Sequence, residues 1–361
     1  MHLRAATLDD LLKSVFVALL KSKSRVVATK GSNVELTGVV LELSEPRARL
    51  SRTDVKGHAF SCLGELFWYL SGSDSSAHME YYLPIYKKFA EPDGTIHGAY
   101  GPRIFGGRRS QYEVVRRLLS RKSSSRQAII QIFDKKDIRR KYTDIPCTCS
   151  LQIIIRDDVL SMIVHMRSND AYLGLPHDVF CFTMIQELLA RDLNCKIGTY
   201  KHMVGSLHLY DRDLQKVSDF LSEGVQPTRA MPPMPKGGQW PTIVKIIEVE
   251  KKLRLDGASA VPMALEIARN TPGYWADIIR LLAIYRVAKI VNDRELDKTV
   301  SGSVAVEALR QIVFIRKEMV SKYYETYIRK RAKALQRLEP QMELAVLPIS
   351  TSLEGPHNAP H

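Results

Sequence analysis

Short runs of apolar and β-branched residues alternate with longer apolar runs along the first two thirds of the chain. The short runs predict strands, which we place at residues 33–43, 127–133, 150–158, 159–168 and 202–211. The longer runs predict helices at residues 1–24, 59–70, 111–121, 178–193 and 211–224. Asp157 and Asp158 lie between two predicted strands and therefore predict a hairpin turn.

The pattern changes after Gly224. Residues 225–241 are rich in proline and glycine, which predicts a linker or an extended arm. Beyond this segment apolar residues recur at helical spacing, and we expect helices at 274–292 and 304–335. The chain is therefore divided into a first domain at 1–235, a helical extension at 236–339 and a disordered tail at 340–361.

Composition narrows the class of protein. Hydrophobic residues make up 45% and charged residues 25% of the 361 residues, an ordinary balance for a soluble globular protein. No apolar run reaches the roughly 18 residues of a membrane span, and the N-terminus lacks the cleavage site of a signal peptide. We expect a cytoplasmic protein with no membrane partner. The net charge of +14 favours anionic partners such as phosphates or nucleic acid.

The cysteines give the first candidate chemistry. The odd count of five suggests no disulfide framework and fits a reducing compartment. Cys147 and Cys149 form a C-x-C pair, but no second Cys or His cluster lies at zinc spacing, so no metal is expected. Cys147, in IPCTCSLQ, follows the basic stretch DKKDIRRKYTD, and cationic neighbours favour a nucleophilic thiolate. A lone cysteine is otherwise more often a small buried hydrophobe.

Several further motifs follow one order and spacing: ELFWYLSG (65–72), GAYG (98–101), RSND (167–170), LGLPHD (173–178) and GSLHLY (205–210). With IPCTCSLQ, they make residues 30–235 resemble thymidylate synthase and its pyrimidine hydroxymethylase relatives. The resemblance implies an α+β fold with a large mixed sheet covered by helices. It also implies a homodimer that associates back to back through the sheets.

The resemblance implies roles for three catalytic residues. Cys147 matches the nucleophile that adds to C6 of the pyrimidine, and Glu65 matches the carboxylate that manages protons through ordered water. Tyr100 matches the tyrosine that assists proton removal at C5. Without the resemblance, Glu65 would be interpreted as a helix cap or a buried ion-pair partner, and Tyr100 as a loop aromatic packed on the core.

Substrate-binding residues follow in the same way. Arg167 and Ser168 match phosphate ligands, since a guanidinium fork suits a phosphate dianion. His208 and Tyr210 match the pair that binds the sugar 3′-hydroxyl. Arg126 matches an arginine that the partner subunit lends, which implies an obligate dimer. Taken alone, the arginines would be solvated charges and His208 a strand histidine with satisfied hydrogen bonds.

The resemblance also implies a co-substrate, 5,10-methylenetetrahydrofolate. Tyr86 and Phe89 stand where synthases have two tryptophans near the folate, and Asp170 and Gly174 match its other side. His177 replaces a usual phenylalanine next to these residues, and it could tune the proton of the neighbouring Asp178.

Asp178 bears on the choice of base. Thymidylate synthases have an asparagine here, whose amide donates to uracil O4 and accepts from N3–H. Cytosine reverses this edge, since its N4 donates and its N3 accepts, and a protonated Asp complements it. The cytidylate hydroxymethylases of the family carry an Asp at this position. Without the family, Asp178 would be interpreted as a helix N-cap after Pro176.

Departures from the family pattern bear on the product. Thr148 and Gln127 replace a usual histidine and a second phosphate arginine. The loop arginine that completes the phosphate site has no clear counterpart among its candidates, Arg47, Arg49 and Arg52. The usual C-terminal closing segment is replaced by the extension, and a looser folate pocket favours addition of water.

The leading hypothesis is therefore a cytidylate (CMP or dCMP) 5-hydroxymethylase that transfers a one-carbon unit from methylenetetrahydrofolate with addition of water. A pyrimidine nucleotide C5-methylase is the alternative within enzymes. A non-catalytic nucleotide- or nucleic-acid-binding protein on the same scaffold is the alternative of another class. The choice between ribose and deoxyribose, the pathway and the role of the extension stay open.

Overall fold

A seven-stranded mixed sheet forms the centre of the computed structural model, which describes residues 1–28, 30–51, 53, 59–226, 229–271, 273–292, 307–308 and 310–319. The strands run in the order β1-β3-β7-β6-β5-β4, and β2 pairs with β3. Their bounds are β1 His2–Ala5, β2 Arg25–Ala28, β3 Gly31–Leu43, β4 Ile129–Gln131, β5 Thr148–Arg156, β6 Val159–Asp170 and β7 Lys196–Tyr210. The α+β prediction is confirmed.

Strand register brings distant motifs together. β5 and β6 form the predicted hairpin, and Asp157 and Asp158 take the positive φ angles of 50° and 58° that such a tight turn requires. β6 and β7 are parallel neighbours, so that Ser168 pairs with Ser206 and Asp170 with His208. The RSND and GSLHLY motifs therefore end side by side, at the C-terminal ends of these two neighbouring strands.

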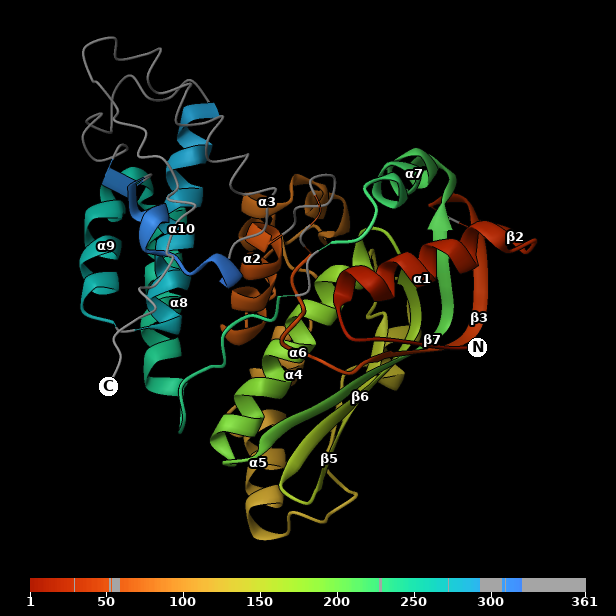
Figure 1. Ribbon diagram of the computed structural model, residues 1–361, viewed down its shortest axis with the longest axis horizontal. Helices are drawn as coiled ribbons and strands as arrows, with labels where there is room; N and C mark the ends of the chain where they lie inside the picture. Colours follow the sequence, from red (N-terminus) through yellow and green to blue (C-terminus); the bar gives the residue numbers. More distant parts are fainter. Residues whose placement is uncertain are drawn as a thin grey trace, which may run out of the picture.

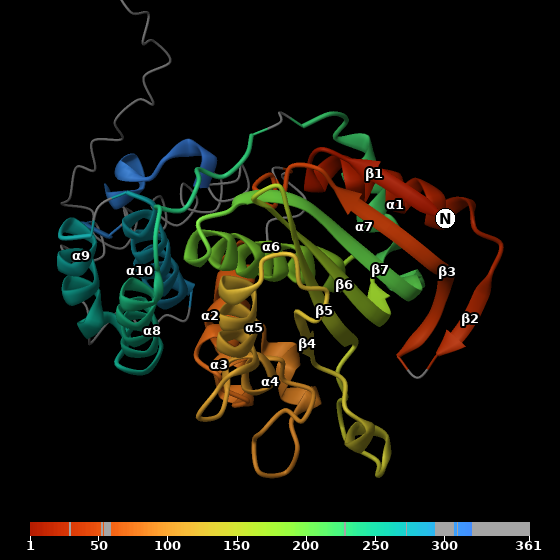
Figure 2. The same ribbon diagram turned by 90° about the horizontal axis from the view of Figure 1, so that it is seen from below.

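Helices cover the sheet and build a second group beside it (Figures 1 and 2). The helices of the first domain are α1 Leu8–Lys21, α2 Ala59–Leu70, α3 Ser76–Tyr82, α4 Gly101–Phe105, α5 Gln111–Arg121, α6 Gly174–Asp192 and α7 Leu214–Ser222, with 3₁₀ helices η1 Pro84–Phe89, η2 Lys135–Ile138 and η3 Asp211–Asp213. α6 packs against β6 and β7 on one side and α2 on the other, and is buried along almost its whole length. No helix in the described ranges is long and apolar enough to cross a membrane.

The structure corrects several predicted elements. Residues 1–24 hold the edge strand β1 before α1, because β1 gains its hydrogen bonds from β3. The helix expected at 178–193 begins at Gly174, after a turn in which Asp170 accepts hydrogen bonds from the backbone N–H groups of Tyr172 and Leu173. Asp178 thus lies inside α6, and its interpretation as an N-cap is wrong. β4 is shorter, and β7 longer, than expected.

The expected helix at 304–335 is also not continuous. Its described part contains two short 3₁₀ helices, η5 Gln311–Phe314 and η6 Lys317–Met319. The remainder of that helix, and the tail expected from residue 340, lie outside the described residues.

The extension contains α8 Trp240–Leu255, η4 Gly257–Ala260, α9 Val261–Arg269 and α10 Tyr274–Asn292, of which α8 and α10 pack on α2. Tyr285 on α10 stacks on Tyr82 of α3 with ring centroids 5.2 Å apart, and lies 4.8 Å from Phe60 of α2. The Tyr82 hydroxyl donates to Glu250 Oε1 on α8 at 2.9 Å. The extension therefore supports α2 and α3 from outside.

A buried ion pair ties α6 to the segment before α2, and its loss should destabilise the fold. Arg49 and Glu187 are both fully buried and paired, and Glu187 also accepts the backbone N–H of Met234 at 2.9 Å. Arg49→Met leaves the buried Glu187 carboxylate with only the longer 3.5 Å contact to Arg191, which should lower the free energy of unfolding by about 3–5 kcal/mol. Urea denaturation measures this change.

Arg25→Met serves as the control. Its pair with Asp211 is largely exposed, so the same substitution there should cost less than about 1 kcal/mol. Equal losses in the two variants would contradict the assignment of Arg49 as a structural residue.

Candidate active site

Cys147 lies in the last position before β5, where the neighbouring strand β6 supplies a cation. The Arg167 guanidinium donates from Nε to the Pro146 carbonyl at 2.9 Å and from Nη2 to the Ile145 carbonyl at 3.2 Å. The same Nη2 lies 3.7 Å from Cys147 Sγ. Arg167 thus fixes the chain that carries the thiol and places positive charge beside the sulfur.

Opposing effects act on this thiol. Burial raises the pKa of Cys147 to about 11, and the negative charges of Asp144 and Asp178 add to the rise, while Arg167 and Lys30 oppose it. Burial wins in the free protein, so the thiol is mostly protonated at neutral pH. The nearby cations limit the cost of forming the thiolate.

Lys30 is a site residue that the sequence analysis missed. It lies in the turn between β2 and β3, and its Nζ is 4.4 Å from the centre of the Phe89 ring. Burial raises the pKa of Asp144 and lowers that of His208, and the charge of Lys30 opposes the first shift and adds to the second. In the sequence, an isolated Lys-Gly pair predicts only a solvated loop. Its proximity to the thiol arises from the tertiary fold.

Glu65 on α2 accepts hydrogen bonds from two tyrosine hydroxyls. Tyr69, one helical turn later, donates to its Oε1 at 2.6 Å, and Tyr86 from η1 donates to the same oxygen at 3.2 Å. The Tyr86 ring packs edge-on against Trp68. A residue expected near the folate is therefore also bonded to the expected proton-handling carboxylate. Tyr69 was missed, although its i+4 spacing from Glu65 is a usable signal.

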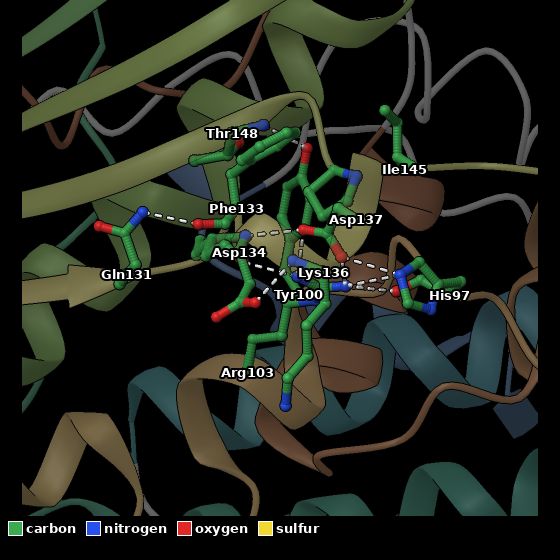
Figure 3. A network of polar contacts seen from close by, with 12 residues as sticks. His97, Tyr100, Arg103, Gln131, Phe133, Asp134, Lys136, Asp137, Ile145 and Thr148 are labelled. Carbon is green, nitrogen blue, oxygen red and sulfur yellow. Dashed lines mark hydrogen bonds and ion pairs between the residues drawn. The ribbon is translucent and has the colours of Figure 1, made fainter. Parts of the chain in front are cut away.

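Tyr100 precedes α4 and faces the start of β5. Its hydroxyl accepts the backbone N–H of Thr148 at 3.2 Å, next to the nucleophile candidate, as Figure 3 shows. Burial raises the pKa of Tyr100 well above its ordinary range, and Asp178 and Cys147 contribute to the rise. The phenol therefore stays neutral and can pass a proton.

An ion-pair network anchors the helix that follows Tyr100 (Figure 3). Arg103 donates to both carboxylate oxygens of buried Asp137 at 2.7 Å and to the Ile132 carbonyl at 2.7 Å. His97 contacts the same carboxylate at 2.8 Å. This network joins α4 to η2 and β4, and so holds Tyr100 against β5.

Asp178 is 6% exposed on the face of α6 that meets β6. Asn169 Nδ2 donates to its Oδ2 at 2.7 Å. Burial, followed by the negative charge of Glu65, raises the pKa of Asp178 well above its usual value. The neutral carboxyl is therefore favoured, in agreement with the acid form invoked for a cytosine edge.

His177 points to α2. Its Nε2 lies 2.8 Å from Ser61 Oγ and its Nδ1 lies 2.8 Å from the Leu173 carbonyl. These bonds lock the imidazole between two helices. Its expected place at the folate remains a prediction.

The ends of β6 and β7 carry the remaining expected ligands. His208 and Tyr210 pack edge to face at 5.0 Å, and burial lowers the pKa of His208, so that it is neutral. Asp170 lies opposite His208, and its Oδ1 accepts from the backbone N–H groups of Tyr172 and Leu173 in the turn before α6. A Cβ at Gly174 would lie 3.1 Å from Asn169 Nδ2, so glycine leaves room for the Asn169–Asp178 pair.

The candidate phosphate arginines fall in different places. Arg126 is exposed before β4, with Gln127 beside it. Arg47 donates to the Met231 carbonyl at 2.9 Å, and Arg49 is buried with Glu187 and is not available to a phosphate. Arg52 lies outside the described residues. In the described part of the chain, no group of three or more His, Cys, Asp or Glu side chains is placed to hold a metal ion.

The Cys147 thiol thus lies beside the Arg167 guanidinium, and the Asp178 carboxyl of α6 and the Tyr100 phenol before α4 lie near it. The sequence model of the family described as thymidylate synthase matches residues 28–236, so the chain belongs to the thymidylate synthase family. It is similar to a deoxyuridylate hydroxymethyltransferase of Delftia phage PhiW-14, with 29% identity over 205 residues. The match covers 53% of this chain and 57% of that relative.

Thiol reactivity should report the charges around Cys147. Asp144→Asn removes a negative charge that raises its pKa, so more thiolate forms at pH 8 and alkylation by iodoacetamide should speed up several-fold. Lys30→Gln should slow it for the opposite reason. Peptide-resolved mass spectrometry gives the rate for each cysteine.

Cys149 is an internal control in the same digest, because burial and Arg167, but not Asp144 or Lys30, act on its pKa. Equal rate changes at both cysteines, or none at Cys147, would show that these charges do not act on the thiol.

Proposed function

We propose that this protein is a cytidylate 5-hydroxymethylase that joins a one-carbon unit to C5 of CMP or dCMP. The proposed choice of base rests on Asp178, whose carboxyl group is buried and has a pKa raised well above its ordinary value. A neutral carboxyl offers one donor and one acceptor, which complements N3 and N4–H of cytosine. Against uracil the amide of an asparagine would serve better.

The side chains support covalent catalysis. The Cys147 thiolate forms a bond to C6, and the electron pair of the C5–C6 double bond moves to C5, which then bonds to the incoming carbon. Tyr100 lies where a neutral phenol can take part in removing the C5 proton, and Glu65 with its two tyrosine donors can hold and return protons through water. The C5 proton is lost, the bond between the transferred carbon and the amine that carried it breaks, water adds to the exocyclic carbon, and expulsion of the Cys147 thiolate restores the C5–C6 double bond. Arg167 and Lys30 can hold the phosphate.

Methylenetetrahydrofolate would supply the carbon at the oxidation level of formaldehyde. Tyr86 and Phe89 of η1 are half-buried aromatic rings in edge-to-face contact, and Lys30 lies over Phe89. Such a wall suits an aromatic ring system that carries carboxylates. We propose that the opposite side of the folate is lined by Asp170, Gly174 and His177.

Hydroxymethylation is preferred over methylation for two reasons. Two smaller aromatic side chains stand where tryptophans are expected in synthases, which leaves more room for water to attack the exocyclic carbon. The name of the phage relative also specifies hydroxymethyl transfer. That name specifies deoxyuridylate as well, so uridylate hydroxymethylation is the second candidate, and Asp178 separates the two.

We also propose a homodimer in which Arg126 serves the neighbouring active site. Arg126 is exposed, and no contact among the described residues brings it to Cys147 of its own chain. A phosphate that binds Arg167 in one subunit would gain a second guanidinium from the other.

Product mass tests the reaction and the base together. The protein is incubated with methylenetetrahydrofolate and CMP, dCMP, UMP and dUMP, and a gain of about 30 mass units on a cytosine nucleotide is expected from addition of CH2O. Cys147→Ala should abolish turnover. Asp178→Asn should move the preference toward uridylate by about 10- to 100-fold, since a mismatched buried hydrogen bond costs about 1–3 kcal/mol.

A gain of about 14 mass units would instead identify a methylase. A wild-type preference for uridylate, or an unchanged preference in Asp178→Asn, would overturn the assignment of the base.

Subunit complementation tests Arg126. Mixed dimers of the inactive variants Cys147→Ala and Arg126→Gln contain one intact site if the arginine acts across the interface. Random reassociation should then restore about a quarter of wild-type activity. No recovery, with mixed dimers verified by mass spectrometry, would place Arg126 in its own subunit's site, and an Arg126→Gln variant that is active by itself would place it outside the chemistry.

A further inference from the structure

A chain of buried polar side chains lies behind Asp178. The Tyr200 hydroxyl is 2.7 Å from His202 Nδ1, His202 Nε2 is 3.2 Å from Asn169 Oδ1, and Asn169 Nδ2 is 2.7 Å from Asp178 Oδ2. Tyr200 and His202 are fully buried on β7, and Asn169 is 4% exposed on the adjacent β6. The catalytic steps proposed above use none of these three residues.

The hydrogen bonds in this chain have a fixed direction. Burial lowers the pKa of His202 to about 3, so its ring is neutral and carries one N–H. Asn169 Oδ1 can only accept, so that N–H is on Nε2, and Nδ1 accepts from the Tyr200 hydroxyl. In this orientation the Asn169 amide presents its N–H to Asp178.

We propose that Tyr200, His202 and Asn169 form a relay that sets base selectivity by fixing Oδ2 of Asp178 as a hydrogen-bond acceptor. The carbonyl oxygen of a neutral carboxyl is a stronger acceptor than its hydroxyl oxygen, so the hydrogen bond from Asn169 Nδ2 to Oδ2 favours the proton on Oδ1. The carboxyl then presents its donor and acceptor in one order rather than two.

A fixed order matters because cytosine and uracil require opposite orders of donor and acceptor. A carboxyl group without the relay could place its proton on either oxygen and would accommodate both bases. The relay residues act through Asp178 and are positioning residues. This inference rests on the proposed function, in which Asp178 contacts the base.

The test compares the ratio of kcat/KM for cytidylate over uridylate in wild type and variants. Asn169→Leu is close in shape and removes the bond to Asp178, so the ratio should fall about tenfold. Tyr200→Phe removes only the hydroxyl that fixes the His202 tautomer and should lower the ratio by a smaller factor. Loss of general stability would reduce both rates and leave their ratio unchanged.

Tyr112→Phe is the matched control. Tyr112 is equally buried and donates to Asp192 at 2.8 Å, at the other end of α6 from Asp178, so the ratio should not change. If Asn169→Leu does not fold, as judged by circular dichroism, the kcat/KM ratio of Tyr200→Phe alone tests the relay. If no turnover is found, the ratio of the dissociation constants of CMP and UMP replaces the kinetic ratio.

The outcomes separate the two proposals. A wild-type ratio retained in the folded relay variants would overturn the relay and leave the base assignment intact. A wild-type preference for uridylate would overturn the base assignment. A ratio that still changed in Asn169→Leu and Tyr200→Phe would then support the relay as the element that sets selectivity.

Discussion

Desolvation of ionisable groups between α6 and the sheet controls the protonation of the whole site. Burial is the largest cause of the raised pKa values of Cys147, Asp178 and Tyr100 and of the lowered pKa of His202. An apolar helix that packs on two parallel strands leaves little room for water. At Cys147, the nearby Arg167 guanidinium reduces the cost of forming a charge.

The position of α2 follows from packing on both of its sides. α6 contacts one side, and α3 with the extension contacts the other. At Gly64, a Cβ would lie 2.3 Å from the Tyr82 ring, so α2 and α3 meet at a position that only glycine fits without displacement. Tyr82 in turn stacks on Tyr285 and bonds to Glu250. The helical extension thus supports the helix that carries Glu65.

Local patterns predicted what local chemistry determines. The β5–β6 hairpin followed from β-branched runs around Asp157 and Asp158, and α5 and α10 follow their apolar patterns from end to end. The edge strands β1 and β2, four residues each, were missed because pairing with β3 stabilises them. Motif residues such as Glu65 and Asp178 could be found in the sequence, whereas Lys30 and His202 could not. Their relevance arises only from residues that are distant in the chain.

Protonation links base recognition to the nucleophile. An ionised Asp178 would raise the pKa of Cys147 and would stand near the carboxylate of Glu65, so each charge would oppose the others. A neutral Asp178 removes one of the negative charges that disfavour the thiolate, and leaves burial and Asp144 as the causes that Arg167 and Lys30 oppose. The acid form that complements cytosine is therefore also the form that least hinders attack by the thiol. An asparagine at this position would be neutral too, so the carboxyl changes the donor and acceptor order at the base while it preserves the electrostatics at the sulfur.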